Sequence, residues 1–478
     1  MSPASRSVHW ALLAASIAAY LILFAVYYPP THGIEDEVGF LNQALALSRG
    51  AITPQGAGFE ALADFREFNG RFVGIRNPGR PLITAPFVAL GGLPSAFASG
   101  ALLHVALAGI AALLFCRIGM SPLWAALVLF HPTLALYSRT VMGDAASGTM
   151  LLAVIVATTS RRHSGLKAGL AIGAAALMRY QAGLVAPFVG LAILLDRERP
   201  DARRQAAACV LTAAAAGAAI VAMNYWLYGS ATGIVKGVFG LEYLAGNALF
   251  YGAALNALWP LMLLMALFGA SRIRAAAAAV WAPVLAFFLF YYFFDVGTGP
   301  AETLVLGQRL LQIALPALIA SYAAALDARF APILNRKLPA AVTGLAVLAF
   351  LTAMAGATGV MFSRHQEHLM TLLRTRQAIV DAVPPGATLF TNTVAEKLVG
   401  VPYEGVPAYR LRVFETQAVR EHRAAHGGEW YVALKEKEGL LQIDPGILGF
   451  LEKESECRSI PAASDGLFLF RCGVPQSP

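Results

Sequence analysis

The stretch from Val8 to Tyr28, VHWALLAASIAAYLILFAVYY, decides the fold class, because it is almost entirely apolar and is followed by the acidic segment THGIEDE of Thr31 to Glu37. An apolar run of about 20 residues is long enough to cross a hydrocarbon core of roughly 30 Å. A charge at the bilayer centre costs roughly 2.5 to 3.5 kcal/mol on insertion scales, so acids kept beside a membrane helix usually have a function. The sequence therefore indicates a membrane protein with a site at the mouth of its first helix.

The composition of the whole chain agrees with this class. Hydrophobic residues make up 58% of the 478 residues, charged residues make up only 13%, and the mean hydropathy is +0.62. Soluble domains carry about 25% charged residues. The net charge of +8 would also fit a nucleic-acid-binding protein, but the arginines fall between apolar runs and do not form one soluble basic face. The chain is therefore expected to contact the lipid bilayer and no nucleic acid.

Repeated apolar runs predict a multi-pass α-helical membrane protein with about 11 transmembrane helices. The predicted spans are residues 8–28, 95–116, 123–137, 145–160, 166–178, 182–195, 206–228, 249–269, 275–294, 310–326 and 339–362. The first run follows Arg6, as a secretory signal would. It is longer than the usual apolar core of a signal and has no small-residue cleavage site, which favours an uncleaved first helix.

Basic residues give the expected orientation. If the spans alternate, the basic clusters of residues 161–167, 197–204 and 329–337 fall on one side, which is cytoplasmic by the positive-inside rule. The amino terminus is then cytoplasmic, and three segments face outward: residues 29–94, 229–247 and 363–478. Together with the Ala- and Arg-rich composition, this predicts a protein of the bacterial cytoplasmic (inner) membrane.

The last segment differs from the rest, because charges return and apolar runs shorten. We predict a transmembrane domain over residues 1–362, with a first outer loop at 29–94, and a small mixed α/β extracytoplasmic domain over 363–478. In that domain a helix is expected at 365–383, a turn at Pro384-Pro385-Gly386, and strands at 388–391, 430–434 and 467–470. Its two cysteines, Cys457 and Cys472, either form a disulfide in an oxidising compartment or remain free thiols.

Short blocks of polar residues follow one another along the outward side of the predicted spans. They are Gly33–Glu37 (GIEDE) with Phe40 and residues 44–50, Asn77–Leu82 (NPGRPL), Tyr137–Asp144 (YSRTVMGD), Ala176–Tyr180 (ALMRY), and Gln308-Arg309 followed by Leu315-Pro316. In this order the blocks resemble the C-type (GT-C) glycosyltransferases, which use sugars attached to polyprenyl phosphate. The resemblance covers residues 8–326. It is nearest to the branch of lipid A aminoarabinose transferases, protein O-mannosyltransferases and lipopolysaccharide galacturonosyltransferases.

The resemblance implies an inverting glycosyltransferase that moves a hexosyl or pentosyl unit from a polyprenyl-phosphate donor to a cell-envelope acceptor on the outer face of the membrane. The acceptor would be a lipopolysaccharide, a polysaccharide or a protein. Some of these enzymes have Lys-Pro-Pro-Leu where this chain has Gly79-Arg80-Pro81-Leu82. This departure leaves the identity of the sugar open.

Transfer from a lipid phosphate needs a base for the acceptor proton and cations for the departing phosphate, but no general acid, because the phosphate leaves as a stable anion. Asp36 is the predicted base, and Glu37 and Asp144 complete the predicted catalytic residues. Asp36 and Asp144 could also be helix N-caps. Asp144 lies beside Arg139 on the outward side. Asp36, Asp144 and Arg309 are expected to line one outward cavity, where the two acids could orient the acceptor or bind a divalent cation. The spacing of the His, Cys and acidic residues indicates no dedicated metal site, and no cofactor is expected.

Five cationic residues on the outward side are predicted to bind the donor phosphate. They are Arg309, Arg139, Arg80, Arg179 and Lys236. Any one arginine could instead snorkel to the interface, but several together favour an anionic ligand, because a guanidinium matches phosphate oxygens. The stretch around Lys236 either lies at the membrane interface and guides the lipid or is a solvated loop.

Three histidines have simpler predicted roles. His104 and His131 lie within predicted spans, where hydrogen bonds between helices are expected rather than metal binding. His32 lies near the acid pair and could tune it. The main alternative function is a transporter or flippase of an anionic lipid-linked sugar, and a non-catalytic assembly subunit is a third. Transporters carry their binding residues near the bilayer midplane, whereas the charges here gather at the outer ends of the spans.

Overall fold

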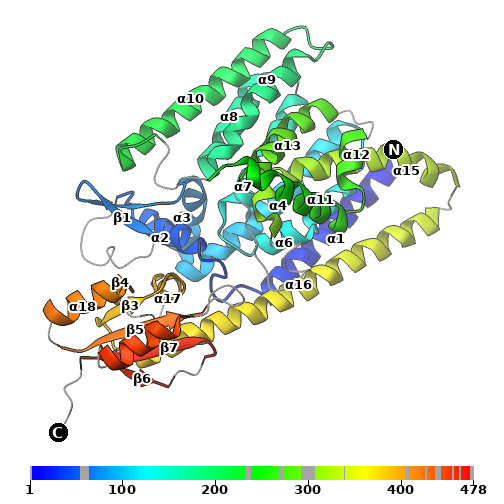
Figure 1. Cartoon of the computed structure of the whole chain (residues 1–478). Helices are drawn as coiled ribbons and strands as arrows, with labels where there is room; N and C mark the ends of the chain where they lie inside the picture. Colours follow the sequence, from blue (N-terminus) through cyan, green and yellow to red (C-terminus); the bar gives the residue numbers. More distant parts are fainter. Residues whose placement is uncertain are drawn as a thin grey trace. The chain divides into compact units, whose positions relative to one another are not determined.

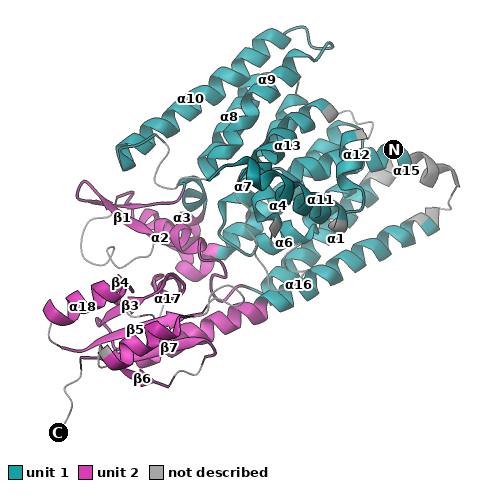
Figure 2. Ribbon diagram, viewed as in Figure 1, with its two compact units in different colours: residues 1–28, 77–83, 97–365 teal, residues 29–76, 84–96, 366–478 magenta. Residues whose placement is uncertain are grey.

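The computed structural model describes residues 3–53, 64–160, 162–231, 238–268, 273–291, 307–337, 340–403, 406, 408–425, 428–436, 443–454, 457–461 and 464–473. The chain forms two compact units, which Figure 2 shows in separate colours. Unit 1 contains Met1–Tyr28, Asn77–Ile83 and Phe97–His365, and unit 2 contains Pro29–Arg76, Thr84–Ala96 and Gln366–Pro478. Most of the first outer loop thus belongs to the same unit as the C-terminal segment. The domain boundary proposed at residue 362 stays a prediction.

Unit 1 is helical, and its elements can be followed in Figure 1. Its α-helices are α1 (Pro3–Val26), the start of α3 (Gly79–Gly91), α4 (Ala98–Arg117), α5 (Ala126–Leu129), α6 (Pro132–Tyr137), α7 (Gly143–Thr158), α8 (Ser164–Met178), α9 (Ala186–Leu194), α10 (Ala202–Tyr228), α11 (Leu244–Leu258), α12 (Met262–Phe268), α13 (Arg274–Leu289), α15 (Leu315–Lys337) and the first part of α16 (Ala340–Ala382). Short 3-10 segments are η2 (Pro122–Ala125), η3 (Tyr180–Val185), η4 (Leu241–Tyr243) and η5 (Gly307–Ile313).

Four helical stretches of the described chain are long and apolar enough to cross a membrane: Ser7–Val26, Leu93–Arg117, Ala202–Tyr228 and Gly344–Ala382. Leu93–Arg117 joins the 3-10 turn η1 (Leu93–Phe97) to α4. Four shorter apolar helices, of 10–17 residues, accompany them. The chain is therefore a predominantly helical membrane protein, while the count of about 11 spans stays a prediction.

Two predicted spans are broken into shorter pieces. Residues 123–137 form η2, α5 and α6, because Pro132 has no N–H to continue a helix and instead starts α6. Residues 249–269 are divided between α11 and α12, where Leu261 follows Pro260 with a left-handed φ of +60°. By contrast, the predicted division of residues 166–195 into two helices is confirmed. Arg179 is extended (φ −148°, ψ 114°) and separates α8 from η3.

Glycines allow α8 and α10 to pack closely. Gly165, Gly169 and Gly173 repeat every four residues on α8, and a Cβ on Gly169 would lie 2.7 Å from the carbonyl oxygen of Cys209 on α10. A Cβ on Gly165 would likewise collide with the backbone of Gln205. Small residues at this spacing let membrane helices approach each other closely. Inside lipid the hydrophobic effect does not hold helices together, so such close packing is what favours their association. The sequence thus fixes which face of α8 meets α10.

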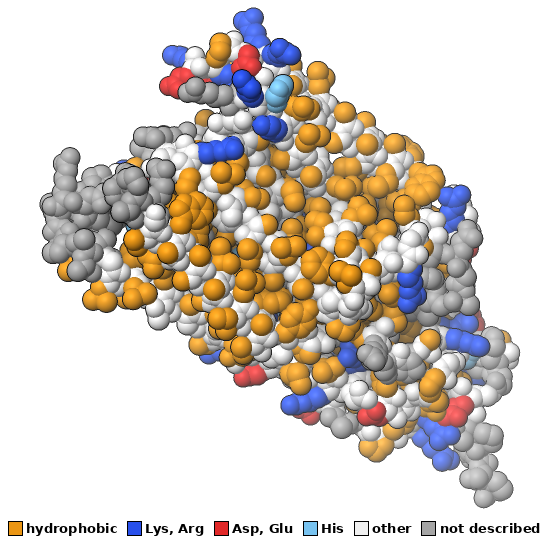
Figure 3. Space-filling view, turned by 180° about the vertical axis from the view of Figure 1, so that it is seen from behind, with side chains coloured by type: hydrophobic (Ala, Val, Ile, Leu, Met, Phe, Trp, Pro, Cys, Tyr) orange, Lys and Arg blue, Asp and Glu red, His pale blue; other side chains and the backbone are white. Residues whose placement is uncertain are grey.

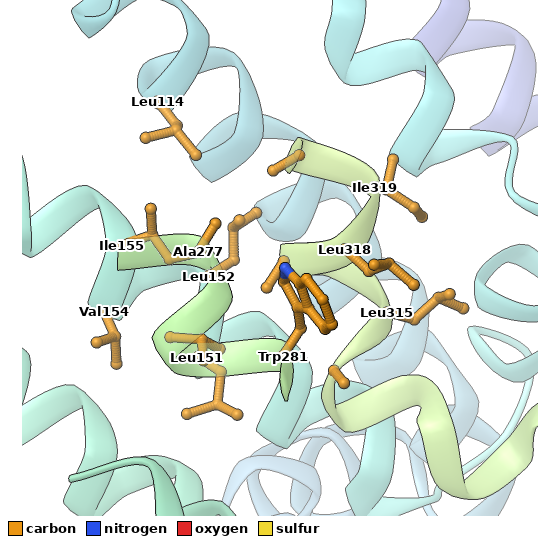
Figure 4. Packing of buried hydrophobic residues seen from close by; sticks show 14 of the residues in the cluster. Leu114, Leu151, Leu152, Val154, Ile155, Ala277, Trp281, Leu315, Leu318 and Ile319 are labelled. Atoms are coloured by element: carbon orange, nitrogen blue, oxygen red, sulfur yellow. The ribbon is translucent and has the colours of Figure 1, made fainter. Parts of the chain in front are cut away.

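The core of unit 1 brings together helices that are distant in the sequence. Figure 4 shows Trp281 of α13 among Leu151 and Leu152 of α7 and Leu315 and Leu318 of α15. These side chains are between 0% and 5% exposed and belong to one cluster of buried apolar residues. The core therefore holds α7, at whose first turn Asp144 lies, firmly against α13 and α15.

The outer surface of unit 1 is apolar. Large hydrophobic side chains of its helices are exposed, among them Leu21, Ile22, Leu170, Leu191, Leu194 and Leu211. Figure 3 shows a wide area of hydrophobic side chains, with Lys and Arg side chains gathered near the upper end of the view. A soluble protein would expose only small apolar patches, so this surface is suited to contact with lipid.

Unit 2 begins with α2 (Glu37–Ser48) and a hairpin of β1 (Phe65–Phe68) and β2 (Arg71–Gly74). The hairpin turns at Asn69-Gly70, and both residues have positive φ, of 50° and 72°. Asn-Gly with two left-handed residues is the preferred two-residue hairpin turn, because its twist matches that of the strands. This turn fixes the register, with Phe65 opposite Gly74.

The C-terminal segment of unit 2 forms a five-stranded mixed sheet in the order β4-β3-β5-β7-β6. Its strands are β3 (Thr388–Thr391), β4 (Arg410–Val413), β5 (Trp430–Lys435), β6 (Arg458–Ile460) and β7 (Leu467–Cys472). β3 is parallel to β4 and β5, and β7 is antiparallel to β5 and β6. The sequence-predicted strands at 388–391, 430–434 and 467–470 are thus present.

Alternate residues of the strands face two separate cores. Leu389 and Tyr431 pack with residues of α16 and α17 (Thr393–Val399), whereas Phe390 and Trp430 pack with residues of α18 (Thr416–Ala425) and the π-helical turn η6 (Phe450–Glu454), which follows α19 (Pro445–Gly449). This alternation is what a strand buried on both faces requires. Of the two alternatives for Cys457 and Cys472, a disulfide or two free thiols, the structure has the disulfide.

The connection from the last span into the C-terminal segment differs from the prediction. A span at 339–362 and a separate helix at 365–383 were expected, but α16 is one helix of 43 residues from Ala340 to Ala382. No proline or glycine occurs between residues 360 and 385 except Pro384 and Pro385, so nothing in the sequence breaks the helix at residue 363. The charged half simply continues the helical hydrogen bonding of the apolar half.

Candidate active site

Asp36 lies at the N-cap position of α2 but does not have the geometry of a cap. Its backbone is αR (φ −65°, ψ −21°), whereas a capping residue is extended and offers its side-chain oxygen to the helix N–H groups. Its Oδ1 lies 2.8 Å from Nη2 of Arg76, and its side chain is 32% exposed. A cation therefore holds this carboxylate where solvent can reach it. Arg76 was missed in the sequence, although it directly precedes the Asn77–Leu82 block.

Glu37 accepts hydrogen bonds from the chain just before α2. It is fully buried, and its Oε2 accepts hydrogen bonds from the backbone N–H groups of Gly33 at 2.9 Å and Ile34 at 3.0 Å. A carboxylate in the first turn is also favoured by the helix dipole. Glu37 therefore stabilises the turn that leads into α2, and its role in catalysis stays a prediction.

Asp144 forms a buried ion pair with Arg179. Oδ2 of Asp144 lies 2.6 Å from Nη2 of Arg179, and the side chains are 1% and 22% exposed. The extended backbone of Arg179 takes the chain out of α8, which packs against α7, so the guanidinium reaches the first turn of α7. The sequence suggested Arg139 as the neighbour of Asp144. Its ion-pair partner comes instead from the break after α8, which sequence distance alone could not reveal.

Buried polar atoms of this pair and of Gln312 have no hydrogen-bond partner among the described residues: Oδ1 of Asp144, Nε of Arg179, and both side-chain polar atoms of Gln312. Gln312 lies in η5, and its backbone carbonyl contacts Gly148, one turn along α7 from Asp144. Leaving a buried polar group unsatisfied costs about 1 to 3 kcal/mol, and native proteins rarely do so. These atoms are therefore candidates for binding a polar ligand. Gln312 is uncharged, so no sequence pattern singles it out.

Arg80 and Arg139, two predicted phosphate ligands, are both 1% exposed. Nη2 of Arg80 donates to the carbonyl oxygen of Thr140 at 3.2 Å. Arg139 donates through Nη1 to the carbonyl oxygen of Phe362 at 2.9 Å and through Nη2 to that of Tyr27. Arg139 therefore ties the end of α1 to α16. Both arginines contact protein carbonyls in this conformation, and phosphate binding by either stays a prediction.

The remaining predicted cations fall in two different situations. Arg309 is half-buried in η5, the same segment that carries Gln312. Lys236 lies outside the described residues.

The structure joins the predicted residues in two groups. Asp36 and Glu37 belong to unit 2, whereas Asp144, Arg179, Arg80, Arg139 and Arg309 belong to unit 1. Within unit 1, Asp144 and Arg179 are brought together. Within unit 2, Asp36 is brought to Arg76. One outward cavity lined by Asp36, Asp144 and Arg309 stays a prediction.

His32 is buried in unit 2. Its Nδ1 lies 3.2 Å from the Tyr403 hydroxyl, and its Nε2 lies 3.0 Å from the carbonyl oxygen of Lys397. Burial, followed by the charges of Arg376 and Lys397, lowers the pKa of His32 to about 3. Because a carbonyl only accepts, Nε2 must carry the proton and Nδ1 accepts from Tyr403. His32 is therefore a neutral structural residue at neutral pH.

The two histidines of the predicted spans differ from each other. Nε2 of His104 lies 2.7 Å from the carbonyl oxygen of Leu129, which is the expected hydrogen bond between helices. His131 is fully buried, and neither of its ring nitrogens has a hydrogen-bond partner among the described residues. Among the residues that the structure describes, no group of three or more His, Cys, Asp or Glu residues is arranged to hold a metal ion. Metal dependence of the site stays untested.

No protein-family model matches the sequence, and no curated protein matches it. Solved structures do match. ArnT from Cupriavidus metallidurans bound to undecaprenyl phosphate superposes with a TM-score of 0.62 at 12% identity, over 98% of this chain and 99% of ArnT. The apo state of ArnT gives a TM-score of 0.62 at 13% identity, over 99% of each chain.

A more distant match is the archaeal oligosaccharyltransferase AglB from Archaeoglobus fulgidus, in complex with an inhibitory peptide and a dolichol-phosphate. Its TM-score is 0.52 at 10% identity, over 91% of this chain and 70% of AglB. Identities this low bear on the fold alone. The chain has the fold of ArnT and AglB, which confirms the fold implied by the resemblance noted in its sequence.

Proposed function

We propose that the chain is an inverting glycosyltransferase that moves a hexosyl or pentosyl unit from a polyprenyl-phosphate donor to a cell-envelope acceptor on the outer face of the bacterial cytoplasmic membrane. The observation that carries the proposal is the buried pair of Asp144 and Arg179, in which Oδ1 of Asp144 and Nε of Arg179 have no hydrogen-bond partner among the described residues. The fold supports it, because one solved state of ArnT contains undecaprenyl phosphate and AglB was solved with a dolichol-phosphate.

The unsatisfied donors of Arg179 and Gln312 suit an anionic ligand. Nε of Arg179 and the amide nitrogen of Gln312 donate, and a phosphate offers only acceptors. Charge-assisted hydrogen bonds of this kind are roughly twice as strong as neutral ones. Asp144 fixes one edge of the guanidinium and leaves Nε for the ligand. Arg179 is therefore the first candidate for binding the donor phosphate, with Arg309 of η5 the second. Arg80, Arg139 and Lys236 follow.

Asp36 is the proposed base. It would accept the proton of the acceptor hydroxyl while that oxygen attacks the anomeric carbon, and the lipid phosphate would leave as an anion held by arginines. Attack from the side opposite the phosphate inverts the anomeric centre. The Asp36 carboxylate is partly exposed and held by Arg76 at 2.8 Å, so a hydroxyl can reach it, as this step requires.

A panel of radiolabelled polyprenyl-phosphate sugars, presented to the purified protein in nanodiscs with an envelope extract, tests the proposal. We expect label to move from one donor to an acceptor. Asp36→Asn should lower the rate by about 100-fold or more, the range for a lost general base. Glu67→Gln, in exposed strand β1 of the same unit, is the matched control and should transfer normally.

Two outcomes contradict the proposal. A folded Asp36→Asn protein with full activity would exclude Asp36 as the base. A wild-type protein that moves intact donor across a bilayer without transferring the sugar would be a flippase, the alternative function.

A further inference from the structure

Four charged side chains of unit 2 form a chain of alternating charge that ends at Asp36. Nζ of Lys397 lies 2.6 Å from Oδ1 of Asp64, and Oδ2 of Asp64 lies 2.8 Å from Nη2 of Arg76. The same Nη2 lies 2.8 Å from Oδ1 of Asp36. We call these four residues the unit 2 ion chain. Three of them come from the first outer loop, and Lys397 comes from α17 of the C-terminal segment.

The β1–β2 hairpin places the middle of the ion chain. Asp64 precedes β1 and Arg76 closely follows β2, so the register of the hairpin brings them to the same end. The backbone N–H of Ile75 donates to the carbonyl oxygen of Asp64 at 3.0 Å and continues the ladder by one bond. Nε of Arg76 adds a second contact to Oδ2 of Asp64, at 3.1 Å. The pair is therefore held by backbone geometry as well as by charge.

α2 accommodates the pair closely. A Cβ on Gly39, one turn after Asp36, would lie 2.6 Å from Cγ of Arg76 and 2.7 Å from Oδ2 of Asp64. A real Cβ essentially never makes contacts this short, so only glycine allows Arg76 to cross α2 at this point. The side chain of Arg76 thus reaches Asp36 along the surface of α2.

The helix that carries Lys397 is itself anchored on the first outer loop. His32 donates to the carbonyl oxygen of Lys397 at 3.0 Å, and Nδ2 of Asn42 donates to that of Gly400 at 2.9 Å. These carbonyls are among the last of α17, which lack partners within the helix. Loop side chains therefore replace the missing hydrogen bonds and fix the position of α17 within unit 2.

Exposure is lowest at Asp64 and increases through Arg76 to Asp36. The side chains of Asp64 and Lys397 are 5% and 10% exposed, that of Arg76 is 18% exposed, and that of Asp36 is 32% exposed. Asp64 carries one negative charge but contacts two cations. Without Lys397, Asp64 could turn fully toward Arg76 and draw it away from Asp36. Lys397 thus keeps Oδ1 of Asp64 in its own contact and leaves only Oδ2 for Arg76. Through Arg76, Lys397 therefore determines the position of Asp36.

We propose that Lys397 is a positioning residue for Asp36, and that the C-terminal segment contributes it to the site through the unit 2 ion chain. The kinetic part of this inference rests on the proposed function, which makes Asp36 the base. The structural part does not depend on activity, so two experiments with separate readouts test it.

The first experiment measures stability by thermal unfolding of the full chain in nanodiscs. Lys397→Met and Asp64→Asn should each lower the Tm by several degrees. Asp64→Asn leaves the buried Lys397 without its counter-ion, and Lys397→Met removes one of the two cations that compensate the buried Asp64. The double variant should lose no more than the worse single variant, because it removes both charges. Lys453→Met, at an exposed lysine of the same segment, should leave the Tm unchanged. Fully additive losses would overturn the ion chain.

The second experiment measures kcat and the donor KM separately. Lys397→Met should lower kcat by about tenfold, since a misplaced base slows the chemical step, and should leave KM within about twofold. Lys397→Arg keeps the charge and should restore most of kcat, whereas a general folding defect would not be rescued in this way. A wild-type kcat in Lys397→Met, beside an inactive Asp36→Asn, would overturn the inference and leave the proposed function standing. If the wild type transfers no sugar, the proposed function fails and the stability experiment still decides on the ion chain.

Discussion

Oδ2 of Asp144 lies 2.6 Å from Nη2 of Arg179, and the aspartate side chain is almost completely buried. Removing one partner of a buried pair leaves the other charge uncompensated, which costs about 3 to 5 kcal/mol in full burial. Arg179 is 22% exposed, so water recovers part of this cost. The pair therefore links the stability of unit 1 to its candidate ligand site.

Asp144→Asn should lower the free energy of unfolding by about 2 kcal/mol and the transfer rate by at least about tenfold, because Arg179 loses the charge that orients it. Chemical denaturation in detergent micelles and initial transfer rates measure the two effects. The control is Asp196→Asn, which removes a pair with Arg199 whose aspartate side chain is 42% exposed. That change should cost less than about 1 kcal/mol. Equal losses in both variants would contradict a special role for Asp144.

Glu37→Gln separates a structural role from a catalytic one. Glutamine keeps an acceptor oxygen for the N–H groups of Gly33 and Ile34 but has no negative charge. We expect Glu37→Gln to keep most of the transfer activity and Glu37→Ala to lose about 1 to 2 kcal/mol of stability, as for a lost cap. If Glu37→Gln is folded and as inactive as Asp36→Asn, then Glu37 takes part in the chemistry.

Gly39→Ala should displace Asp36, the proposed base, through Arg76 and without a direct contact to Asp36. The new methyl group would overlap Arg76 and Asp64, so we expect a loss of about 1 to 3 kcal/mol in stability, as for overpacking, and a lower kcat. Gly252→Ala in α11 is the control, because a Cβ there meets nothing within 4 Å. It should be neutral or stabilising by up to about 1 kcal/mol. A normal kcat in Gly39→Ala would show that Arg76 need not cross α2 at this point.

The stability of unit 2 should fall in mild acid because of His32. Its pKa falls from 6.5 to about 3 on folding, so between these values the unfolded chain binds a proton that the folded chain does not. The free energy of unfolding therefore rises with pH in this window, and this residue alone should make the protein about 2 kcal/mol less stable at pH 5 than at pH 7.5. Unfolding curves at the two pH values measure the difference.

His32→Gln provides the comparison for this pH dependence. Glutamine does not titrate, so the variant should lose about 2 kcal/mol less between pH 7.5 and pH 5 than the wild type does. An identical slope in both proteins would mean that His32 does not titrate on unfolding.

Much of the fold followed from sequence pattern. The strand at Thr388–Thr391 has the predicted bounds, and β5 and β7 extend the predicted strands by one and two residues. Apolar run length and alternation are strong signals for such elements. The short strands β4 and β6 were missed, because their exposed residues give no alternating pattern. The β1–β2 hairpin was also missed, although Asn69-Gly70 is a known turn signal.

The candidate site was predictable only in part. Acids and arginines near span ends could be selected because charge beside lipid is costly. Their partners could not, since Asp64 and Lys397 are separated by 333 residues and meet only through the fold. The same limit applies to Asp144 and Arg179, which a break in the helical chain brings together. Charge identifies a candidate residue, but tertiary contacts decide its neighbour.

The oxidation state of the Cys457–Cys472 pair, which forms a disulfide here, indicates the compartment in which the C-terminal segment lies. Cytosolic reductants keep thiols reduced, whereas the periplasm oxidises them. Electrophoretic mobility after alkylation of intact cells would therefore report the side of the membrane on which residues 457–472 mature. The same assay applied to each variant above would also separate export failure from loss of chemistry.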